Sequence, residues 1–283
     1  MHKMSWPRQI LSQLGLGAAG LFVLAPVWGI FYLAFDGGVK GWPMTFRIWP
    51  EKPTLDMFIQ VWNRTSQSLS FPSLLLNSLF VSVGAALLSV GLGASMAYAF
   101  ARYRFPGRKA GLMGLLVGAL LPPVALMTPL YMLLTMLGLR TSLWGLMIVY
   151  TSFSMPFCIW NMRSAFQAVS IELEEAAFLD GAGPLTSFWK VTLPLALPAI
   201  SVAALIAFLI GYSEFAMSWL FVERAQNVTL AMAIAGALQG GVMESWSKLA
   251  ALAVMMSLPV VLIFLLLQRF LLDRLLFTTT GTE

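Results

Sequence analysis

The sequence is divided into long stretches without a charged residue, and these stretches constrain the fold more than any other feature. A helix needs about 20 apolar residues to cross the roughly 30 Å of hydrocarbon in a bilayer. Only 10% of the residues are charged, whereas soluble domains carry about 25%. We therefore predict an all-α membrane protein with six transmembrane helices, within residues 9–35, 65–101, 110–139, 141–162, 191–222 and 249–268.

The distribution of basic residues predicts the orientation of these spans. The densest basic cluster follows the second span and should be cytoplasmic by the positive-inside rule; it comprises Arg102, Arg104, Arg108 and Lys109. An even number of spans places both termini on one side, so both are predicted to be cytoplasmic. The first apolar run is interpreted as a retained span, with a cleaved signal peptide as the alternative.

Several function classes are disfavoured by composition. The net charge is +5, but the basic residues are dispersed between apolar blocks, whereas a nucleic-acid interface would gather them on one face. Membrane lipid is therefore an expected partner and nucleic acid is not. Cys158 and His2 are the only residues of their types, so neither an internal disulfide nor a histidine metal site is predicted.

Prolines recur inside the predicted spans or at their ends. Each proline removes a helix N–H donor and kinks the chain unless neighbours compensate. Such a bundle is more typical of a mobile transporter than of a rigid anchor, and the prolines concerned are Pro26, Pro72, Pro122, Pro123, Pro129, Pro156, Pro198 and Pro259.

A polar segment at about 163–194 lies between the fourth and fifth spans. Ser170 can cap a helix, and Glu172, Glu174 and Glu175 then fall in its first turns, where carboxylates favour the positive end of the helix dipole. An acidic helix on an anionic leaflet is electrostatically disfavoured. We therefore predict a docking surface whose acidic side chains are free to pair with arginine, and the alternative is an amphipathic connector.

A turn and a second helix are predicted to follow. Gly181 or Gly183 can take the left-handed conformation that ends a helix, and Pro184 is suited to open the next one. The small side chains of Ala176 and Ala177 would let another protein approach closely. The segment is therefore predicted as helix, tight turn and helix on the inner face of the membrane.

This segment also carries a family signature. The pattern E-A-A, three residues, G, nine residues, I-x-L-P is typical of the permeases of binding-protein-dependent ABC importers. The chain matches it with valine for isoleucine, at Glu175, Ala176, Ala177, Gly181, Val191, Leu193 and Pro194. The run Arg102-Tyr103-Arg104-Phe105-Pro106-Gly107 and the triplet Ser213-Glu214-Phe215 also resemble the carbohydrate-type subfamily, near its smaller maltose-type permease subunits.

The resemblance implies an architecture and a set of partners. It implies a type I ABC importer permease fold with a cytoplasmic coupling helix, in the inner membrane of a bacterium. Residues 1–71 would form the first helix and a periplasmic segment, 72–272 the permease domain, and 273–283 a cytoplasmic tail. The partners would be a second homologous permease, two ATP-binding cassette subunits and an extracytoplasmic solute-binding protein. The chain has no G-x-x-x-x-G-K-[ST] phosphate cradle, so ATP and Mg²⁺ are expected on the partner ATPase.

The same resemblance implies which residues touch the ATPase. Glu175 and Asp180 would pair with its basic residues, the alanines would allow close approach, and Gly181 would permit the turn. The full set expected to couple to the ATPase is Glu172, Glu174, Glu175, Ala176, Ala177, Asp180, Gly181, Gly183, Pro184, Leu193 and Pro194.

A second set of candidates lies within the spans. Glu214 is the one acid inside a predicted span, and an intramembrane carboxylate is a functional-site hypothesis by default. It could bind solute, form a gate contact or pair with the companion permease. Asn77, Tyr150 and Tyr212 could line a sugar path, although aromatic residues in spans more often pack or face lipid.

Other functions remain open at this point. The cargo could be a polyol, a glycerol phosphodiester or another organic solute rather than a sugar. An ion-coupled secondary transporter is a further alternative. Such proteins commonly hold paired repeats and intramembrane acids, whereas this chain has one acid, Glu214, inside a predicted span. A membrane scaffold that does not transport is the third.

Overall fold

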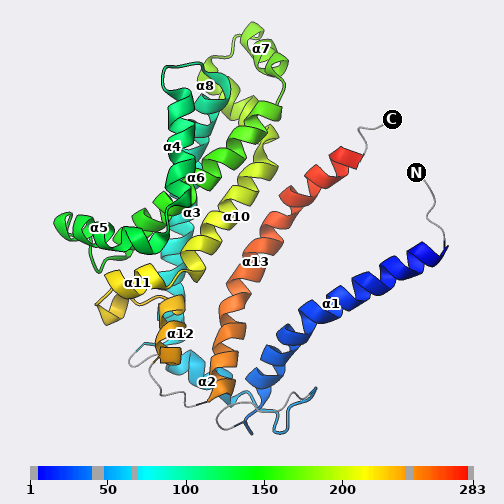
Figure 1. Cartoon of the computed structure of the whole chain (residues 1–283), viewed down its shortest axis with the longest axis vertical. Coiled ribbons are helices and arrows are strands. Elements are labelled where there is room, and N and C mark those ends of the chain that lie inside the picture. Colours follow the sequence, from blue (N-terminus) through cyan, green and yellow to red (C-terminus); the bar gives the residue numbers. More distant parts are fainter. Residues whose placement is uncertain (1–5, 40–47, 66–68, 240–244, 280–283) are drawn as a thin grey trace. The chain divides into compact units, whose positions relative to one another are not determined.

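The computed structural model describes residues 6–39, 48–65, 69–239 and 245–279, and the regular elements in these ranges are helices (Figure 1). One isolated antiparallel bridge joins Asp36 and Pro53. The chain divides into two compact units, Met1–Phe71 with Ile234–Leu258 and Pro72–Ala233 with Pro259–Glu283. The predicted all-helical class is confirmed.

The first unit contains two complete helices and parts of two others. The Asp36 carboxylate follows the first helix and accepts the backbone N–H groups of Gly38 at 2.8 Å and Glu51 at 3.0 Å. The Ser247 hydroxyl donates to the Asp36 carbonyl at 2.6 Å. A buried aspartate thus organises the chain beyond the first helix. The helices that lie wholly or partly in this unit are α1 (Trp6–Phe35), α2 (Asp56–Asn63), α12 (Leu230–Gln239) and α13 (Trp246–Thr279).

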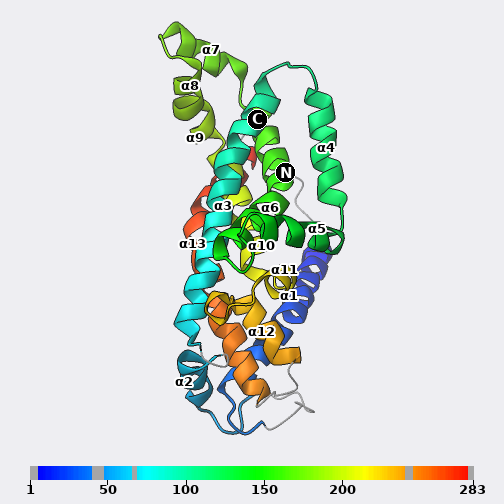
Figure 2. The same ribbon diagram turned by 90° about the vertical axis from the view of Figure 1, so that its left-hand side faces the viewer.

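The second unit is built around three helices, α3 (Phe71–Arg102), α6 (Leu143–Ala168) and α10 (Leu197–Ser213) (Figures 1 and 2). Small residues allow close packing here. A Cβ atom on Gly211 would lie 3.0 Å from the Ser82 Cα, so α10 approaches the backbone of α3. The Ser89 and Ser154 hydroxyls are 2.6 Å apart and join α3 to α6.

The third predicted span is not one straight helix. The structure has α4 (Arg108–Leu120) and α5 (Pro123–Met136), bent by 101° where a single helix over 110–139 was predicted. Leu121 and Pro122 are extended, with ψ angles of 130° and 128°. Proline disfavours the helical conformation in the residue before it, so the Pro122–Pro123 pair ends α4. The prolines were predicted to kink the chain, and this pair does so; that α4 and α5 together form one span stays a prediction.

The fifth predicted span is also bent. The predicted range 191–222 begins inside the π-helical η1 (Phe188–Thr192), which follows α8 (Pro184–Ser187) and leads into α9 (Leu193–Leu195). The stretch Pro184–Leu195 meets α10 at 78°. Within the described ranges four helices are long and apolar enough to cross a membrane, or up to six if each bent pair is one span. The count of six therefore stays a prediction.

The end of that span differs from the prediction as well. α10 ends at Ser213, Glu214 is extended with ψ 129°, and a separate helix α11 (Ala216–Phe221) follows. Glu214 was predicted to lie inside a span. In the structure it lies between two helices. The short 3-10 turn η2 (Ala225–Asn227) then leads to α12.

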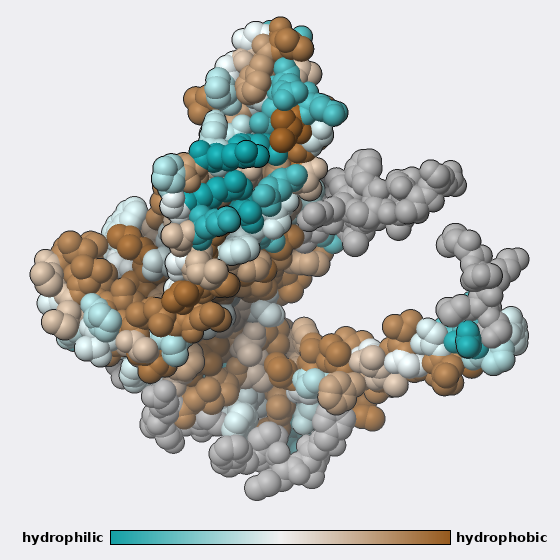
Figure 3. All heavy atoms as spheres, turned by 45° about the horizontal axis from the view of Figure 1, so that its top comes forward, coloured by the Kyte–Doolittle hydropathy of each residue, from teal (hydrophilic) through white to brown (hydrophobic). Residues whose placement is uncertain are grey.

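The surface of the second unit is strongly partitioned by polarity. Figure 3 shows hydrophilic side chains gathered at the end that carries α7 (Ile171–Leu179) and the α3–α4 connection, whereas the region of α5 is hydrophobic. Exposed apolar side chains on a spanning helix are expected where lipid takes the place of water.

Candidate functional site

The polar segment forms the predicted pair of helices with a turn between them (Figure 2). The Ser170 hydroxyl caps α7 by accepting the backbone N–H of Glu172 at 3.3 Å. Gly181 has a φ of +85°, the left-handed conformation that ends a helix, and Pro184 is the first residue of α8. Gly183 instead has a φ of −77° and is extended. Of the two glycines considered, Gly181 makes the turn.

Most of the residues expected to couple to the ATPase are exposed on this segment. Ala177 and Leu193 are half-buried, and Glu174 is buried. The exposed members of the set are Glu172, Glu175, Ala176, Asp180, Gly181, Gly183, Pro184 and Pro194.

Glu174 points into the protein, unlike its two acidic neighbours. Its Oε1 accepts from Arg102 Nε at 2.8 Å and from the Thr192 hydroxyl at 2.7 Å, and its Oε2 accepts from the Tyr98 hydroxyl at 3.0 Å. The Glu174 and Arg102 side chains are only 6% and 10% exposed. The expectation that the acidic side chains are free to pair with another protein's arginine is therefore wrong for Glu174, because Arg102 of the same chain already holds it.

The surroundings of Glu174 keep it charged. Burial by itself raises the pKa of the Glu174 carboxyl, but the hydrogen bonds from Thr192, Arg102 and Tyr98 outweigh burial, and the pKa is lowered. The Tyr98 ring contacts Phe166 and Phe188 at centroid distances of 5.9 and 4.8 Å, so an aromatic layer lies beside the ion pair.

The sequence pattern gave Tyr98, Arg102 and Thr192 no role in the coupling segment, and Arg102 entered only as part of the basic cluster and of the family-like run. One signal was present for the first two, because residues four apart lie on the same face of a helix and a tyrosine–arginine pair at that spacing forms one polar patch. No local signal connects that patch to Glu174, which lies 72 residues beyond Arg102 in the chain.

A second polar group forms around α11, where two of the candidate path residues meet. The Glu214 carboxylate accepts the backbone N–H of Ala216 at 2.8 Å and the N–H of Met217 at 3.0 Å. The Tyr150 hydroxyl donates to Glu214 Oε2 at 2.8 Å and lies 2.6 Å from the Ser218 hydroxyl. Glu214 thus caps the start of α11, which is a structural task, and its roles toward solute or a gate stay predictions.

The other two path candidates lie elsewhere. The Asn77 amide donates to the carbonyls of Gln226 and Val228 at 2.7 and 2.9 Å, so it holds the connection between α11 and α12. Tyr212 is buried in α10, and its ring stacks on Phe208 with the centroids 5.2 Å apart. The structure therefore joins Tyr150 with Glu214 and places Asn77 and Tyr212 in other contacts.

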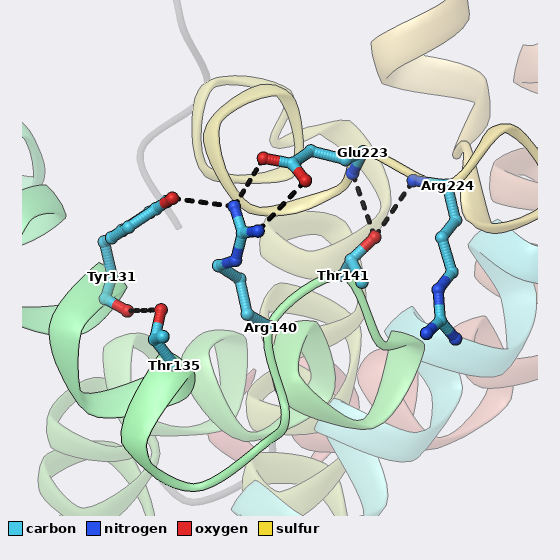
Figure 4. A network of polar contacts seen from close by, with 6 residues as sticks. All are labelled: Tyr131, Thr135, Arg140, Thr141, Glu223 and Arg224. Atoms are coloured by element: carbon cyan, nitrogen blue, oxygen red, sulfur yellow. Dashed lines mark hydrogen bonds and ion pairs between the residues drawn. The ribbon is translucent and has the colours of Figure 1, made fainter.

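A further network ties the connection between α5 and α6 to the end of α11 (Figure 4). Arg140 donates to both carboxylate oxygens of Glu223 and, at 2.7 Å, to the Tyr131 hydroxyl. The Thr141 hydroxyl accepts the backbone N–H groups of Glu223 and Arg224 at 3.0 and 2.9 Å. The Arg224 guanidinium points away from this group in Figure 4. The network lies near the N-terminal end of α6, whereas Val169 and Glu174 follow its C-terminal end.

With this geometry in place, comparison with known proteins identifies the class. A family model described as "Binding-protein-dependent transport system inner membrane component" matches residues 51–276, a range that includes both ion pairs and the whole of α7 to α11. The chain belongs to this family. It is therefore a multi-pass membrane protein, the permease component of an ABC importer.

Relatives with specific names support the same assignment. The maltodextrin transport system permease protein MdxG of Bacillus subtilis (strain 168) is 30% identical over 230 residues, which cover 81% of each chain. The maltose/maltodextrin transport system permease protein MalG of Escherichia coli (strain K12) is 35% identical over 214 residues, 72% of this chain and 71% of MalG.

A solved structure supports the fold. A chain from the crystal structure of a bacterial ABC transporter involved in the import of the acidic polysaccharide alginate matches with a TM-score of 0.76. The match covers 95% of this chain and 99% of the other, at 21% sequence identity. The predicted permease fold is confirmed.

Proposed function

We propose that this chain forms half of the translocation path of an ATP-driven importer for a sugar or oligosaccharide. A second homologous permease would form the other half, two ATP-binding cassette subunits would bind α7 and α8 on the cytoplasmic side, and an extracytoplasmic protein would deliver the solute. ATP and Mg²⁺ would be held by the ATPase, because the sequence contains no phosphate cradle. Both termini of the chain would then be cytoplasmic.

One observation carries the docking of the ATPase. The turn between α7 and α8 exposes acidic and apolar side chains together: Leu179 is 90% exposed and Leu185 is 73% exposed, next to the exposed Asp180. A group of large exposed apolar side chains rimmed by polar residues is typical of a protein interaction surface. Basic residues of the ATPase would pair with Glu175 and Asp180, and the apolar side chains would fill a cleft between them.

The sugar cargo is supported by the relatives, whose names specify maltodextrin and maltose. Switching such a path from inward-facing to outward-facing requires the ATP-bound state to favour one form by several kcal/mol. About 5.5 kcal/mol moves an equilibrium from 1:99 to 99:1.

The direct test is reconstitution of the complete complex in proteoliposomes with its binding protein. Uptake of maltose or maltodextrins should require ATP inside the vesicles and survive an uncoupler. Uptake of polyols alone would overturn the sugar assignment. Uptake that persists without ATP and stops with the uncoupler would overturn the importer class for this complex.

Gly181→Val tests the docking turn. A valine at φ +85° costs about 1–2 kcal/mol of backbone strain, although its Cβ would meet no other atom within 4 Å. The expected result is a complex that assembles and hydrolyses ATP while uptake falls about tenfold. Gly114→Val is the matched control, because this α4 residue has equally open surroundings and no left-handed backbone. Normal uptake by the Gly181 variant would place the docking contact elsewhere.

A further inference from the structure

The attachment of α7 to the rest of the second unit converges on one carboxylate. Two α3 side chains, Tyr98 and Arg102, reach α7, and both donate to Glu174. Thr192, the last residue of η1, donates to the same carboxylate. Arg102 also donates to the Val169 carbonyl at 2.9 Å, just before α7 begins. Three elements therefore meet at a group that exposes only 6% of its side chain.

The elements that meet at Glu174 lead away from it in two directions. α3 has 32 residues, a length of about 48 Å at 1.5 Å per residue. Near its other end the Ser78 hydroxyl accepts the backbone N–H of Leu230 at 2.8 Å, and Asn77 holds the carbonyls of Gln226 and Val228. A displacement of the Arg102 end would thus move a helix that is fastened to the connection after α11.

The second direction runs through η1. Thr192 is followed by α9 and then by the 78° bend into α10. Prolines and π-helical turns are the places where helices usually bend, and this segment has both, with Pro194 and Pro198 after η1. A pull on Thr192 would therefore act on the bend at Ala196.

We propose that Glu174 is a positioning residue that transmits movement of α7 to α3 and α10, and that it forms no part of the docking face. The proposal rests on the function proposed above, in which the ATPase moves α7. Glu175, the next residue, is exposed and belongs to the docking face. Two adjacent acids of α7, only the second of which belongs to the family signature, thus have different tasks, one toward the permease's own helices and one toward the ATPase.

The experiment compares Glu174→Gln with Glu175→Lys in the complete complex. Four quantities are measured: co-purified ATPase, basal ATP hydrolysis, stimulation of hydrolysis by the solute-loaded binding protein, and solute taken up per ATP. Glu174→Gln should retain ATPase binding within about twofold and lose about tenfold in uptake per ATP, because the charge is lost and the amide nitrogen in place of Oε2 cannot accept the Tyr98 hydroxyl. Glu175→Lys should lose ATPase binding.

The control is Glu223→Gln, which breaks the exposed ion pair with Arg140 by the same substitution and should leave uptake per ATP unchanged. If Glu174→Gln releases the ATPase as Glu175→Lys does, Glu174 is a docking residue and the proposal is wrong. Normal uptake per ATP in Glu174→Gln overturns it equally.

A second variant covers a failure of Glu174→Gln to assemble. Thr192→Val keeps the ion pair and removes one hydrogen bond, so it should assemble and lose about fivefold in uptake per ATP. Thr192→Val with full coupling would then overturn the proposal. Failure of the wild-type complex to transport at all, or to bind ATPase, would instead overturn the proposed function.

Discussion

Two ion pairs among the described residues of the second unit differ in burial and in what surrounds them. Arg102–Glu174 joins the last residue of α3 to α7, and its side chains are 10% and 6% exposed. Arg140–Glu223 joins the α5–α6 connection to the residues after α11, and its side chains are 25% and 62% exposed. An exposed pair is well solvated when open, whereas a buried pair that loses one partner leaves an unpaired charge away from water. Separating the partners of the first pair should therefore cost much free energy, whereas the second pair can open at little cost.

Removal of Arg102 should have the largest effect. Arg102→Met leaves the Glu174 carboxylate buried without its cation, and we expect a loss of about 3 kcal/mol in the free energy of unfolding. Thermal unfolding of the purified complex in detergent measures it. The double variant Arg102→Met with Glu174→Met should recover most of this loss, because an apolar pair often replaces a buried ion pair without penalty. A double variant as unstable as the single one would contradict the buried-charge explanation.

Tyr150→Phe tests whether burial, and not position along α6, decides the effect. Tyr150 is fully buried, and its hydroxyl contacts the Glu214 carboxylate and the Ser218 hydroxyl near the same end as Arg140. Loss of the Tyr150 hydroxyl should cost about 1.5–3 kcal/mol, the range for a hydrogen bond to a charged group. Tyr131→Phe removes a hydroxyl from the exposed network and is the matched control. Equal losses in the two variants would show that burial does not decide the effect.

Acid should weaken the buried ion pair at Glu174. The pKa of Glu174 is lowered in the folded state, so its stabilising contribution is complete above its unfolded pKa of about 4.3. The contribution is lost as the pH falls through the lower folded pKa. The difference in Tm between wild type and Glu174→Gln should therefore shrink below about pH 4. A difference that stays constant to pH 3 would show that the charge on Glu174 does not stabilise the fold.

Glu223→Gln should have the smallest effect. Arg140 keeps the Tyr131 hydroxyl and ring, so we expect a change in Tm close to the error of the measurement. High salt should remove any remaining difference in Tm, because dissolved ions screen exposed charges. A change as large as that of Arg102→Met would break the comparison, since it would show that exposure does not weaken this pair.

Local features of the α7–α8 segment could be predicted because neighbouring residues decide them. The Ser170 cap, the left-handed turn at Gly181 and the start of α8 at Pro184 each depend on backbone hydrogen bonding or torsion angles within a few residues. The prolines of the third span likewise signalled a break. The 101° angle at that break was not predictable, because α4 packs on α6 and α5 on α11, contacts that the local sequence does not reveal.

The direction of Glu174 could not be predicted for a different reason. Glu172, Glu174 and Glu175 are chemically alike and share one short helix, so the local sequence does not say which of them faces inward. The carboxylate is held by Tyr98 and Arg102, which lie 76 and 72 residues earlier in the chain. The same holds for Glu214, whose place between α10 and α11 depends on backbone and side-chain contacts that its own neighbours do not reveal.

The sequence by itself determined that this chain enters a membrane as helices, where the polar segment lies and which family it belongs to, because apolar length and short motifs act locally. Only the tertiary structure decided which of three similar acids is buried and paired, and which of the two ion pairs is buried. Burial and charge pairing depend on residues that folding brings together from distant parts of the chain.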